Sequence, residues 1–177
     1  MKSVVIISSS PRKGSNSERL CAEFLRGAEE AGHQAELICL REKSIRYCNA
    51  CYACKKTGRC VLDDDMNDIM DKLTKADVIV LATPVYFYSM SGQLKVFIDR
   101  LVANYLAISA DIYLLAAAWD PDPRNLEPTF EAIRGCTRDC FENCTEKGTI
   151  AVGDVYAPGE IEGRPELKKA YEMGLSC

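Results

Sequence analysis

The sequence predicts an α/β fold in which helices cover both faces of a five-stranded parallel sheet. Short runs of apolar, mostly β-branched residues alternate with segments whose apolar residues recur at helical spacing. The runs are continuous rather than alternating in polarity, which is typical of strands buried on both faces. Because strands and helices alternate along the chain, we expect a doubly wound sheet with right-handed crossovers. The strands are expected at residues 4–7, 37–40, 78–81, 112–118 and 149–152.

The expected helices are marked by apolar residues three and four apart and by residues typical of helix ends. The first contains Leu20 to Ala28 and ends at Gly32, which suits a C-cap. The acidic triplet Asp63 to Asp65 is interpreted as the cap of a helix that begins near Met66, rather than as a metal site. The other helices are expected to contain residues 94–102, to run through about residue 141, and to cover residues 165–173.

Length and composition indicate one globular unit. A chain of 177 residues can bury a proper core, and we expect a single domain over residues 1–177 with a cysteine-rich insertion at about 45–62. The net charge of −4 gives no electrostatic reason to bind nucleic acid, and no basic run marks a membrane surface. The apolar run near the N-terminus is too short for a signal peptide or a spanning helix, so a cytoplasmic location is expected.

The loop after the first strand has the composition of an anion site. In doubly wound sheets, ligands bind at the carboxyl ends of the strands where the strand order reverses. Residues 8–17 read SSSPRKGSNS and lead into a helix, whose free N–H groups favour an anion. Hydroxyls could cradle a phosphate and Arg12 could add a bidentate contact. A solvated turn with Ser15 or Ser17 as N-cap remains an alternative, while dinucleotide and nucleoside triphosphate loop patterns are absent.

The loop after the third strand suits a flat ring system. Three consecutive aromatic residues cannot all point into one core, so some must stack on a ligand or meet solvent. Backbone amides of this loop could bond to ring nitrogens and oxygens. Trp119, in the following loop, could close the pocket or pack at the strand end. Phosphate at one loop and a ring at the next describe FMN, with the ring against Pro84, Val85, Tyr86, Phe87, Tyr88 and Ser89.

Four cysteines are clustered after the second strand, at Cys48, Cys51, Cys54 and Cys60. Thiolates at two-residue intervals can wrap one compact cluster, as in ferredoxins, whereas zinc sites more often use two separated pairs. The spacing favours a [4Fe–4S] cluster over zinc, and thiols that bind nothing permanently remain open. Because the segment follows a parallel strand, we expect it at the same sheet edge as the flavin loops.

The remaining internal cysteines are expected to be small buried side chains. Three of them recur every four residues and would share one helix face against the sheet, rather than form a second metal site. The only histidine, His33, is expected in an exposed turn far from the site and is not a candidate base. These cysteines are Cys21, Cys39, Cys136, Cys140 and Cys144.

The segments SSSPRKGSNSERL and TPVYFYSMSGQLKVFIDR resemble the NADPH-dependent FMN reductase group of the flavodoxin-like superfamily. This resemblance implies strand order 2-1-3-4-5 and a ring flanked by residues 84–89. The sequence departs from the family pattern at Ser9, where glycine is common. The cysteine spacing resembles that of iron–sulfur flavoproteins, whose cysteine motif precedes an acidic stretch, here residues 63–66. The resemblance assigns phosphate binding to Ser10, Arg12, Ser15, Asn16 and Ser17, in the loop that starts at Ser8.

The preferred hypothesis is an oxidoreductase that passes electrons from NAD(P)H or ferredoxin, through FMN and possibly the cluster, to a small acceptor. FMN accepts a hydride or single electrons, and the cluster passes one electron at a time, so no protein nucleophile is needed. A non-enzymatic electron carrier and a cysteine-based redox or metal sensor are the alternatives. Hydrolase motifs are absent. A homodimer or homotetramer is expected.

Overall fold

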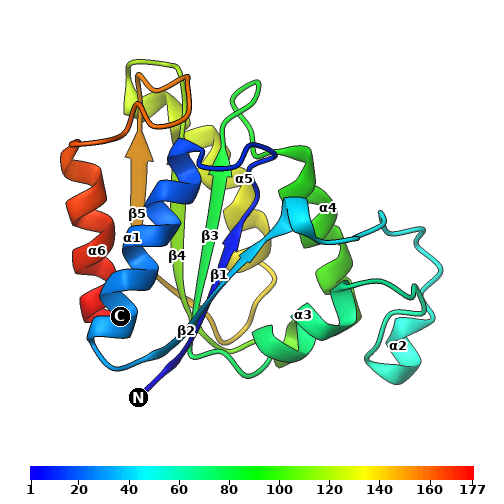
Figure 1. Cartoon of the computed structure of the whole chain (residues 1–177). Coiled ribbons are helices and arrows are strands. Elements are labelled where there is room, and N and C mark those ends of the chain that lie inside the picture. Colours follow the sequence, from blue (N-terminus) through cyan, green and yellow to red (C-terminus); the bar gives the residue numbers. More distant parts are fainter.

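The computed structural model describes residues 1–177 and contains one parallel sheet with strand order β2-β1-β3-β4-β5 (Figure 1). This confirms the predicted flavodoxin-like topology. The second strand begins three residues before its predicted start, and the fifth begins four residues before its predicted start. The strands are β1 (Ser3–Ser8), β2 (Gln34–Cys39), β3 (Val78–Pro84), β4 (Asp111–Ala117) and β5 (Thr145–Val152).

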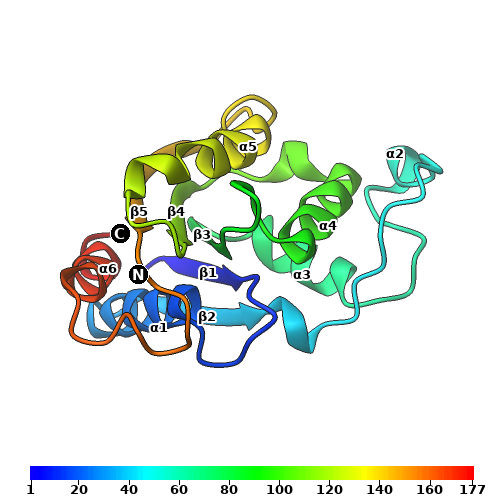
Figure 2. The same ribbon diagram turned by 90° about the horizontal axis from the view of Figure 1, so that it is seen from above.

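Helices cover both faces of the sheet, as Figure 2 shows. One face carries α1 (Asn16–Glu30) and α6 (Pro165–Ser176). The other carries α3 (Met66–Leu73), α4 (Gly92–Arg100) and α5 (Glu127–Thr137). Short helical pieces complete the chain: η1 (Leu40–Glu42), α2 (Cys54–Thr57), η2 (Leu101–Ala103), η3 (Tyr105–Ala107) and η4 (Pro123–Leu126). None of these helices is both long and apolar enough to cross a membrane.

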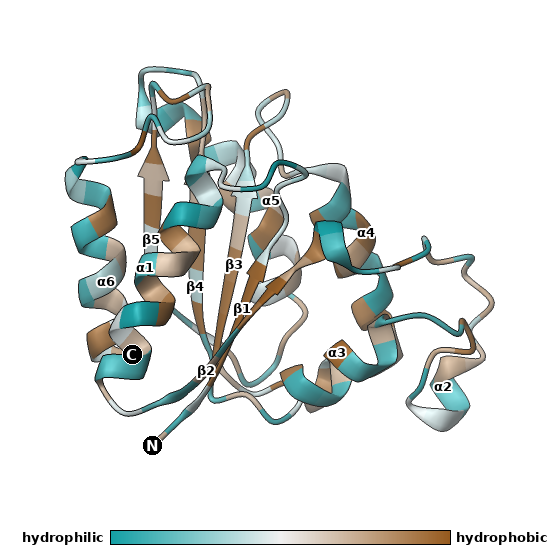
Figure 3. Cartoon of the chain, in the orientation of Figure 1, coloured by the Kyte–Doolittle hydropathy of each residue, from teal (hydrophilic) through white to brown (hydrophobic).

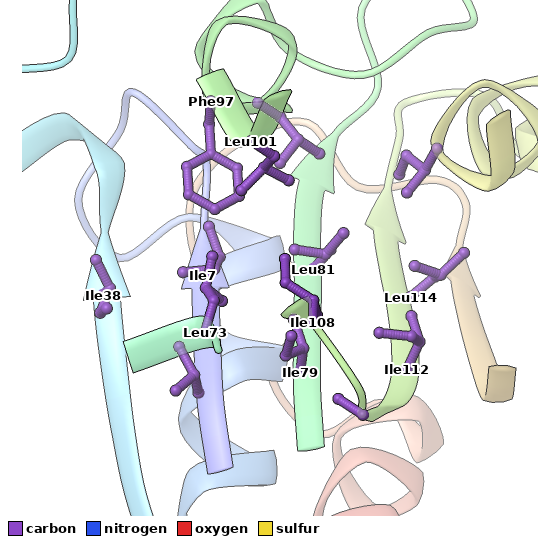
Figure 4. Close-up of a cluster of buried hydrophobic side chains, with 14 of the residues drawn as sticks. Ile7, Ile38, Leu73, Ile79, Leu81, Phe97, Leu101, Ile108, Ile112 and Leu114 are labelled. Carbon is purple, nitrogen blue, oxygen red and sulfur yellow. The ribbon is translucent and has the colours of Figure 1, made fainter. Parts of the chain in front are cut away.

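The core forms two layers, one on each side of the sheet. Successive residues of a strand point to opposite faces, so Val5 and Ile7 pack under α3 and α4 while Val4 and Ile6 pack under α1. Figure 3 shows the strands in hydrophobic colours, and Figure 4 shows Ile7, Leu81 and Leu114 on neighbouring strands, with Phe97 above Ile7. Burial on both faces explains why the strands read as continuous apolar runs.

Helices α1 and α6 approach each other backbone to backbone. A Cβ atom built on Gly174 would lie 2.1 Å from the Phe24 carbonyl oxygen. A Cβ atom on Gly27 would lie equally close, 2.1 Å, to the Tyr171 carbonyl oxygen. Each glycine is therefore required because the facing helix occupies the space that a side chain would need.

Helix α5 ends at Thr137, and this corrects the expectation for the cysteines that follow it. Cys140 is exposed after the helix, and Cys144 lies immediately before β5, so they cannot share a helix face with Cys136. Cys21 is buried as predicted. Cys39, at the end of the edge strand β2, is only half-buried.

Two other predictions about polar residues need correction or refinement. His33 is half-buried rather than exposed, because its Nε2 atom lies 3.1 Å from the carbonyl oxygen of Cys177. The acidic triplet caps α3 as predicted, but it does so through Asp64 rather than through the N-cap residue Asp65, whose side chain binds no N–H group of the helix. The Asp65 carboxylate accepts a hydrogen bond from the Ser44 N–H (2.6 Å), while Asp64 accepts one from the Met66 N–H (3.2 Å). The triplet therefore fastens residues 44–46 to the start of α3.

Candidate functional site

The carboxyl ends of the strands meet at one edge, where four loops gather (top of Figure 1). The order of the sheet reverses at β1, which lies between β2 and β3. Ligands of doubly wound sheets bind at this switch point. The loops cover residues 9–15, 85–91, 118–122 and 153–164.

The first loop is built to receive an anion. Ser15 is the N-cap of α1, as the sequence suggested, and its hydroxyl accepts a hydrogen bond from the Glu18 N–H (3.3 Å). The serine hydroxyls of this loop are buried, although the loop lies at the sheet edge. Unpaired N–H groups at a helix start attract negative charge. The backbone N–H groups without a protein acceptor are those of Ser10, Lys13, Ser15, Asn16 and Ser17.

One carboxylate lies beside this anion site, and its charge is neutralised. Glu18 accepts a hydrogen bond from the Gly14 N–H (3.1 Å), which fixes the turn at the positive φ of Gly14. Arg41 donates to both oxygens of Glu18, at 2.6 and 3.2 Å. Arg12 and Lys13 then contribute positive charge, and Arg12 lies 5.9 Å from the centre of the Tyr156 ring. The loop is therefore electrostatically suited to phosphate.

One predicted phosphate ligand, Asn16, has a side chain that is used elsewhere. The Asn16 side chain donates to the carbonyl oxygen of Ala157 (3.0 Å) and accepts from the Ile161 N–H (3.3 Å). It holds loop 153–164 in place, which leaves only the Asn16 backbone N–H for an anion. Ser8 lies at the end of β1 with a buried hydroxyl that has no partner.

The loop after β3 forms a strained aromatic turn. Tyr86 and Ser89 exchange both backbone hydrogen bonds, at 2.9 and 3.0 Å. Between them, Phe87 and Tyr88 have φ values of 50° and 57°, in the left-handed region. Such a conformation costs on the order of 1–3 kcal/mol per residue and is concentrated at functional sites. Phe87 is fully exposed (103%), so the turn presents an aromatic ring to solvent.

Further contacts connect this turn to the loop after β4. The Tyr88 hydroxyl donates to the Asp120 carboxylate (3.1 Å), and this hydrogen bond raises the pKa of Tyr88. Asp120 also accepts from the Asp122 N–H (2.9 Å), which is the main reason that its pKa is lowered. Trp119 beside it is mostly exposed (74%) and available to a ligand.

A buried polar network connects the anion loop to the aromatic turn. Ser91 is the N-cap of α4, and its hydroxyl lies 3.0 Å from the Ser9 hydroxyl and 3.2 Å from the Ser9 carbonyl oxygen. The Ser91 N–H donates to the Thr83 hydroxyl (2.9 Å). Sequence analysis missed this network, although the departure of Ser9 from the family pattern noted above was a signal for it. The two loops are thus held at a fixed separation.

The cysteine segment lies elsewhere, which corrects the expectation that it shares the flavin edge. In Figures 1 and 2, α2 projects from the side of the molecule, and it contacts η2 at the far end of α4. The physical reason is a long-range anchor. Arg100, the last residue of α4, donates to the Arg46 carbonyl oxygen (2.7 Å) and to both oxygens of Asp64 (2.7 and 3.0 Å). These contacts draw both ends of the segment toward the C-terminus of α4.

The four thiols of this segment do not converge on one point. Cys54 is buried, Cys51 is exposed, and Cys48 and Cys60 are half-buried. No group of three or more potential ligand side chains is close enough to hold a metal ion. A cavity of about 610 Å³ separates the segment from α4 and α5, and Cys136 lines its opposite side. Four cysteine thiols are ligands that iron–sulfur clusters and zinc use, but in this structure the four thiols are too far apart to bind one metal centre.

Arg100 and Asp64 form a buried ion pair, each with a side chain only 1% exposed. Burial disfavours the charged form of Asp64, but hydrogen bonds from Arg100 and from two backbone N–H groups outweigh it and lower its pKa to about 2. Burial also disfavours the charged form of Arg100, but the hydrogen bonds and the negative charge of Asp64 outweigh this effect and raise the pKa of Arg100. The Nε–H group of Arg100 has no hydrogen-bond acceptor. Sequence analysis missed Arg100, although its place three residues after Phe97 put it on the buried face of α4.

The family model for NADPH-dependent FMN reductase matches residues 1–117, which include the anion loop after β1 and the aromatic turn after β3. The chain belongs to the NADPH-dependent FMN reductase family. An iron–sulfur flavoprotein from Archaeoglobus fulgidus is 36% identical over 185 aligned residues, covering 98% of this chain and 77% of that protein. One from Methanosarcina thermophila is 41% identical over 96 residues, covering 54% of this chain and about half (50%) of that relative.

Solved structures support the fold of this FMN reductase family member. The NAD(P)H:quinone oxidoreductase from Methanothermobacter marburgensis aligns with a TM-score of 0.73 at 20% identity, over 99% of this chain and 95% of that one. An azoreductase from Bacillus anthracis aligns with a TM-score of 0.72 at 14% identity, over all of both chains (100% each). At these identities the likeness concerns the fold alone.

Proposed function

We propose that this protein is an FMN-dependent oxidoreductase that passes electrons from NAD(P)H or ferredoxin to a small acceptor. The observation that carries the proposal is the pairing of an anion loop with a strained aromatic turn at one sheet edge. Free N–H groups and buried hydroxyls suit a phosphate, and exposed aromatic side chains nearby suit a flat ring. Membership in the FMN reductase family supports the same cofactor.

In this proposal the chain binds and orients the cofactor, and FMN supplies the hydride and single-electron chemistry when bound. Ser10, Ser15 and Ser17 hold the phosphate through hydroxyls and backbone N–H groups, and Arg12 adds charge from the loop surface. Residues 84–89 flank the ring, and Trp119 lies on its open side. No side chain at this edge needs to act as a covalent nucleophile.

The cysteine segment is proposed to hold a [4Fe–4S] cluster through Cys48, Cys51, Cys54 and Cys60. Four thiols in a compact run are the ligands that such a cluster uses. The names of the relatives from Archaeoglobus fulgidus and Methanosarcina thermophila, both iron–sulfur flavoproteins, support this assignment. Anaerobic purification followed by iron and sulfide analysis tests it, with about four of each expected per chain. Stoichiometric zinc, or the absence of metal from anaerobic preparations, would contradict the cluster.

The phosphate assignment is tested by comparing FMN with riboflavin, which lacks the phosphate. Ser10→Ala and Ser17→Ala each remove a buried hydroxyl next to free N–H groups. A hydrogen bond to a charged group contributes about 1.5–3 kcal/mol, so the Kd for FMN should rise about 10- to 150-fold. Riboflavin affinity should change little, and Ser109→Ala, an exposed serine before β4, is the matched control. Equal losses for FMN and riboflavin would refute the assignment.

The electron donor is tested by anaerobic stopped-flow reduction of the FMN-loaded protein with NADPH, NADH and reduced ferredoxin. Steady turnover of a nicotinamide with a quinone or dye acceptor is expected for the oxidoreductase. Rapid reduction by ferredoxin without nicotinamide turnover would instead favour the electron carrier.

A further inference from the structure

Two cysteines that the proposed function does not use line the cavity between the cysteine segment and helices α4 and α5. They are Cys136, in the last turn of α5, and Cys140, which follows this helix. Cys136 is half-buried and packs against the core beneath α4 and α5, whereas Cys140 is exposed. A reagent in solution therefore reaches Cys140 more readily than Cys136.

The chain makes one further turn between these two cysteines. The Cys140 N–H donates to the Cys136 carbonyl oxygen (3.2 Å), and the Phe141 N–H donates to the same oxygen (3.1 Å). The Cys140 thiol donates to the carbonyl oxygen of Gly135 (3.2 Å), so its sulfur is directed back across this turn. Phe141 is buried and stacks on Tyr105, with ring centres 6.4 Å apart, which fixes the chain after Cys140. Cys136 and Cys140 are thus held one turn apart.

This spacing is close to that of a disulfide. Residues four apart on one turn have Cβ atoms about 5–6 Å apart. A disulfide joins Cβ atoms that are about 3.5–4.5 Å apart, with Cα atoms about 4.4–6.8 Å apart. The chain between the two cysteines is exposed at Arg138 and Asp139 and lies outside α5. A shift of about 1 Å in these residues would bring the two Cβ atoms within range of a disulfide.

The surroundings of the two thiols assign them different chemical roles. Burial raises the pKa of the Cys136 thiol to about 12, and the neighbouring Cys140 sulfur acts in the same direction. Because the thiolate is the form that attacks an oxidant, Cys136 reacts poorly by itself, and an oxidant acts first on the exposed Cys140. A sulfenic acid formed there lies one turn from Cys136, and this proximity favours condensation of the two sulfurs.

We propose that Cys136 and Cys140 form a thiol pair that hydrogen peroxide oxidises reversibly to a disulfide. First, the Cys140 sulfur attacks one peroxide oxygen, the O–O bond breaks, and Cys140 becomes a sulfenic acid as one water is released. The Cys136 sulfur then attacks the Cys140 sulfur, the S–O bond breaks, and the Cys136 proton leaves with the hydroxyl group as a second water. The two electrons lost by the thiols reduce the peroxide. A small dithiol reverses the reaction by exchange and is itself oxidised. This pair depends on neither FMN nor the proposed cluster.

Peptide mapping of the unsubstituted, FMN-loaded protein tests the pair. After peroxide treatment, free thiols are alkylated and the protein is digested with trypsin and chymotrypsin. Cleavage after Arg138 separates Cys136 from Cys140, and cleavage after Phe141 separates Cys140 from Cys144. Mass spectrometry should show the Cys136 and Cys140 peptides joined with the loss of two hydrogen atoms, and dithiothreitol should release them. A link from Cys140 to any other cysteine, or no link at all, would overturn the pair.

Three substitutions separate the roles of the thiols. In Cys136→Ser the sulfenic acid at Cys140 should persist, so dimedone should trap about one adduct per chain, against little in the unsubstituted protein. Cys140→Ser should give neither the link nor an adduct at Cys136. Cys144→Ser is the matched control, because the Cys144 thiol donates to the Ile108 carbonyl oxygen (3.7 Å), and the link should form as before. Equal dimedone labelling of Cys140 with and without Cys136, or loss of the link in Cys144→Ser, would refute the assignment.

Discussion

Replacing Gly174 by alanine should lower the free energy of unfolding, because the facing helix occupies the space that the methyl group needs. The new Cβ atom would lie 2.1 Å from the Phe24 carbonyl oxygen and 2.9 Å from the Ala28 backbone nitrogen. Both contacts are with backbone atoms, which cannot move aside alone, so α1 and α6 must separate by about 1 Å. We expect the cost of this separation at the upper end of the ~1–3 kcal/mol that is typical of overpacking. Alanine regains about 1 kcal/mol of helix propensity. The expected net loss is about 2 kcal/mol.

Gly135→Ala is the matched control, because Gly135 lies in α5 and its Cβ atom would meet nothing within 4 Å. At Gly135 the higher helix propensity of alanine is not opposed by any steric clash, so the free energy of unfolding should rise by about 0.5–1 kcal/mol. For a chain of this length, 1 kcal/mol corresponds to about 2–4 °C in Tm. Differential scanning calorimetry should therefore show a fall of about 4–8 °C for Gly174→Ala and a small rise for Gly135→Ala. Equal rises in both variants would refute the close approach of α1 and α6.

Two further predictions concern buried polar groups. Ser91→Ala removes the N-cap of α4 and the hydrogen bond to Ser9, so it should lower the free energy of unfolding by about 1 kcal/mol. It should also weaken FMN binding, which fluorescence titration measures. A loss of stability with unchanged FMN affinity would show that the network supports only the fold. The pKa of Asp64 is lowered to about 2 in the folded state, so its stabilisation of about 2 kcal/mol is present above pH 4 and is lost as the pH falls toward 2. Asp64→Asn should flatten this part of a urea-denaturation series against pH, and an unchanged acid slope would contradict the ion pair with Arg100.

The sheet was predictable because its strands are buried on both faces. In a run such as Val78 to Leu81 every side chain is buried, so apolar residues do not alternate with polar ones. A continuous apolar run of this kind is a strong signal for a strand of a parallel sheet. The strand ends were not predictable to the residue. Gln34 and Thr145 extend β2 and β5 by backbone pairing with Ser3 and Asp111, and their polar side chains give no sign of it.

The candidate site was predictable where function depends on local sequence. The anion loop is a strand end followed by a helix start, so its composition indicates its chemistry. The role of Asn16 depends on partners 141 and 145 residues away, at Ala157 and Ile161. Loops that follow parallel strands all begin at the same edge of the sheet, but this rule fixes only the first residues of each loop. Residues 44–64 are long enough for the distant contact with Arg100 to hold them at another place.

Helix α4 connects the two proposed redox sites, and this has a testable consequence. Ser91 at its N-terminus belongs to the flavin edge, and Arg100 at its C-terminus holds the cysteine segment. At 1.5 Å per residue, nine helical residues separate the two ends by about 14 Å. Substitutions this far apart without shared partners usually act additively. In a Ser91→Ala/Arg100→Lys double variant, the change in FMN affinity should therefore equal that of Ser91→Ala alone. The rate at which a chelator removes iron from the anaerobically reconstituted double variant should equal that of Arg100→Lys alone, in which lysine replaces the residue that holds the cysteine segment. A double variant whose iron loss exceeds that of Arg100→Lys would show that α4 transmits changes from the flavin edge to the cysteine segment.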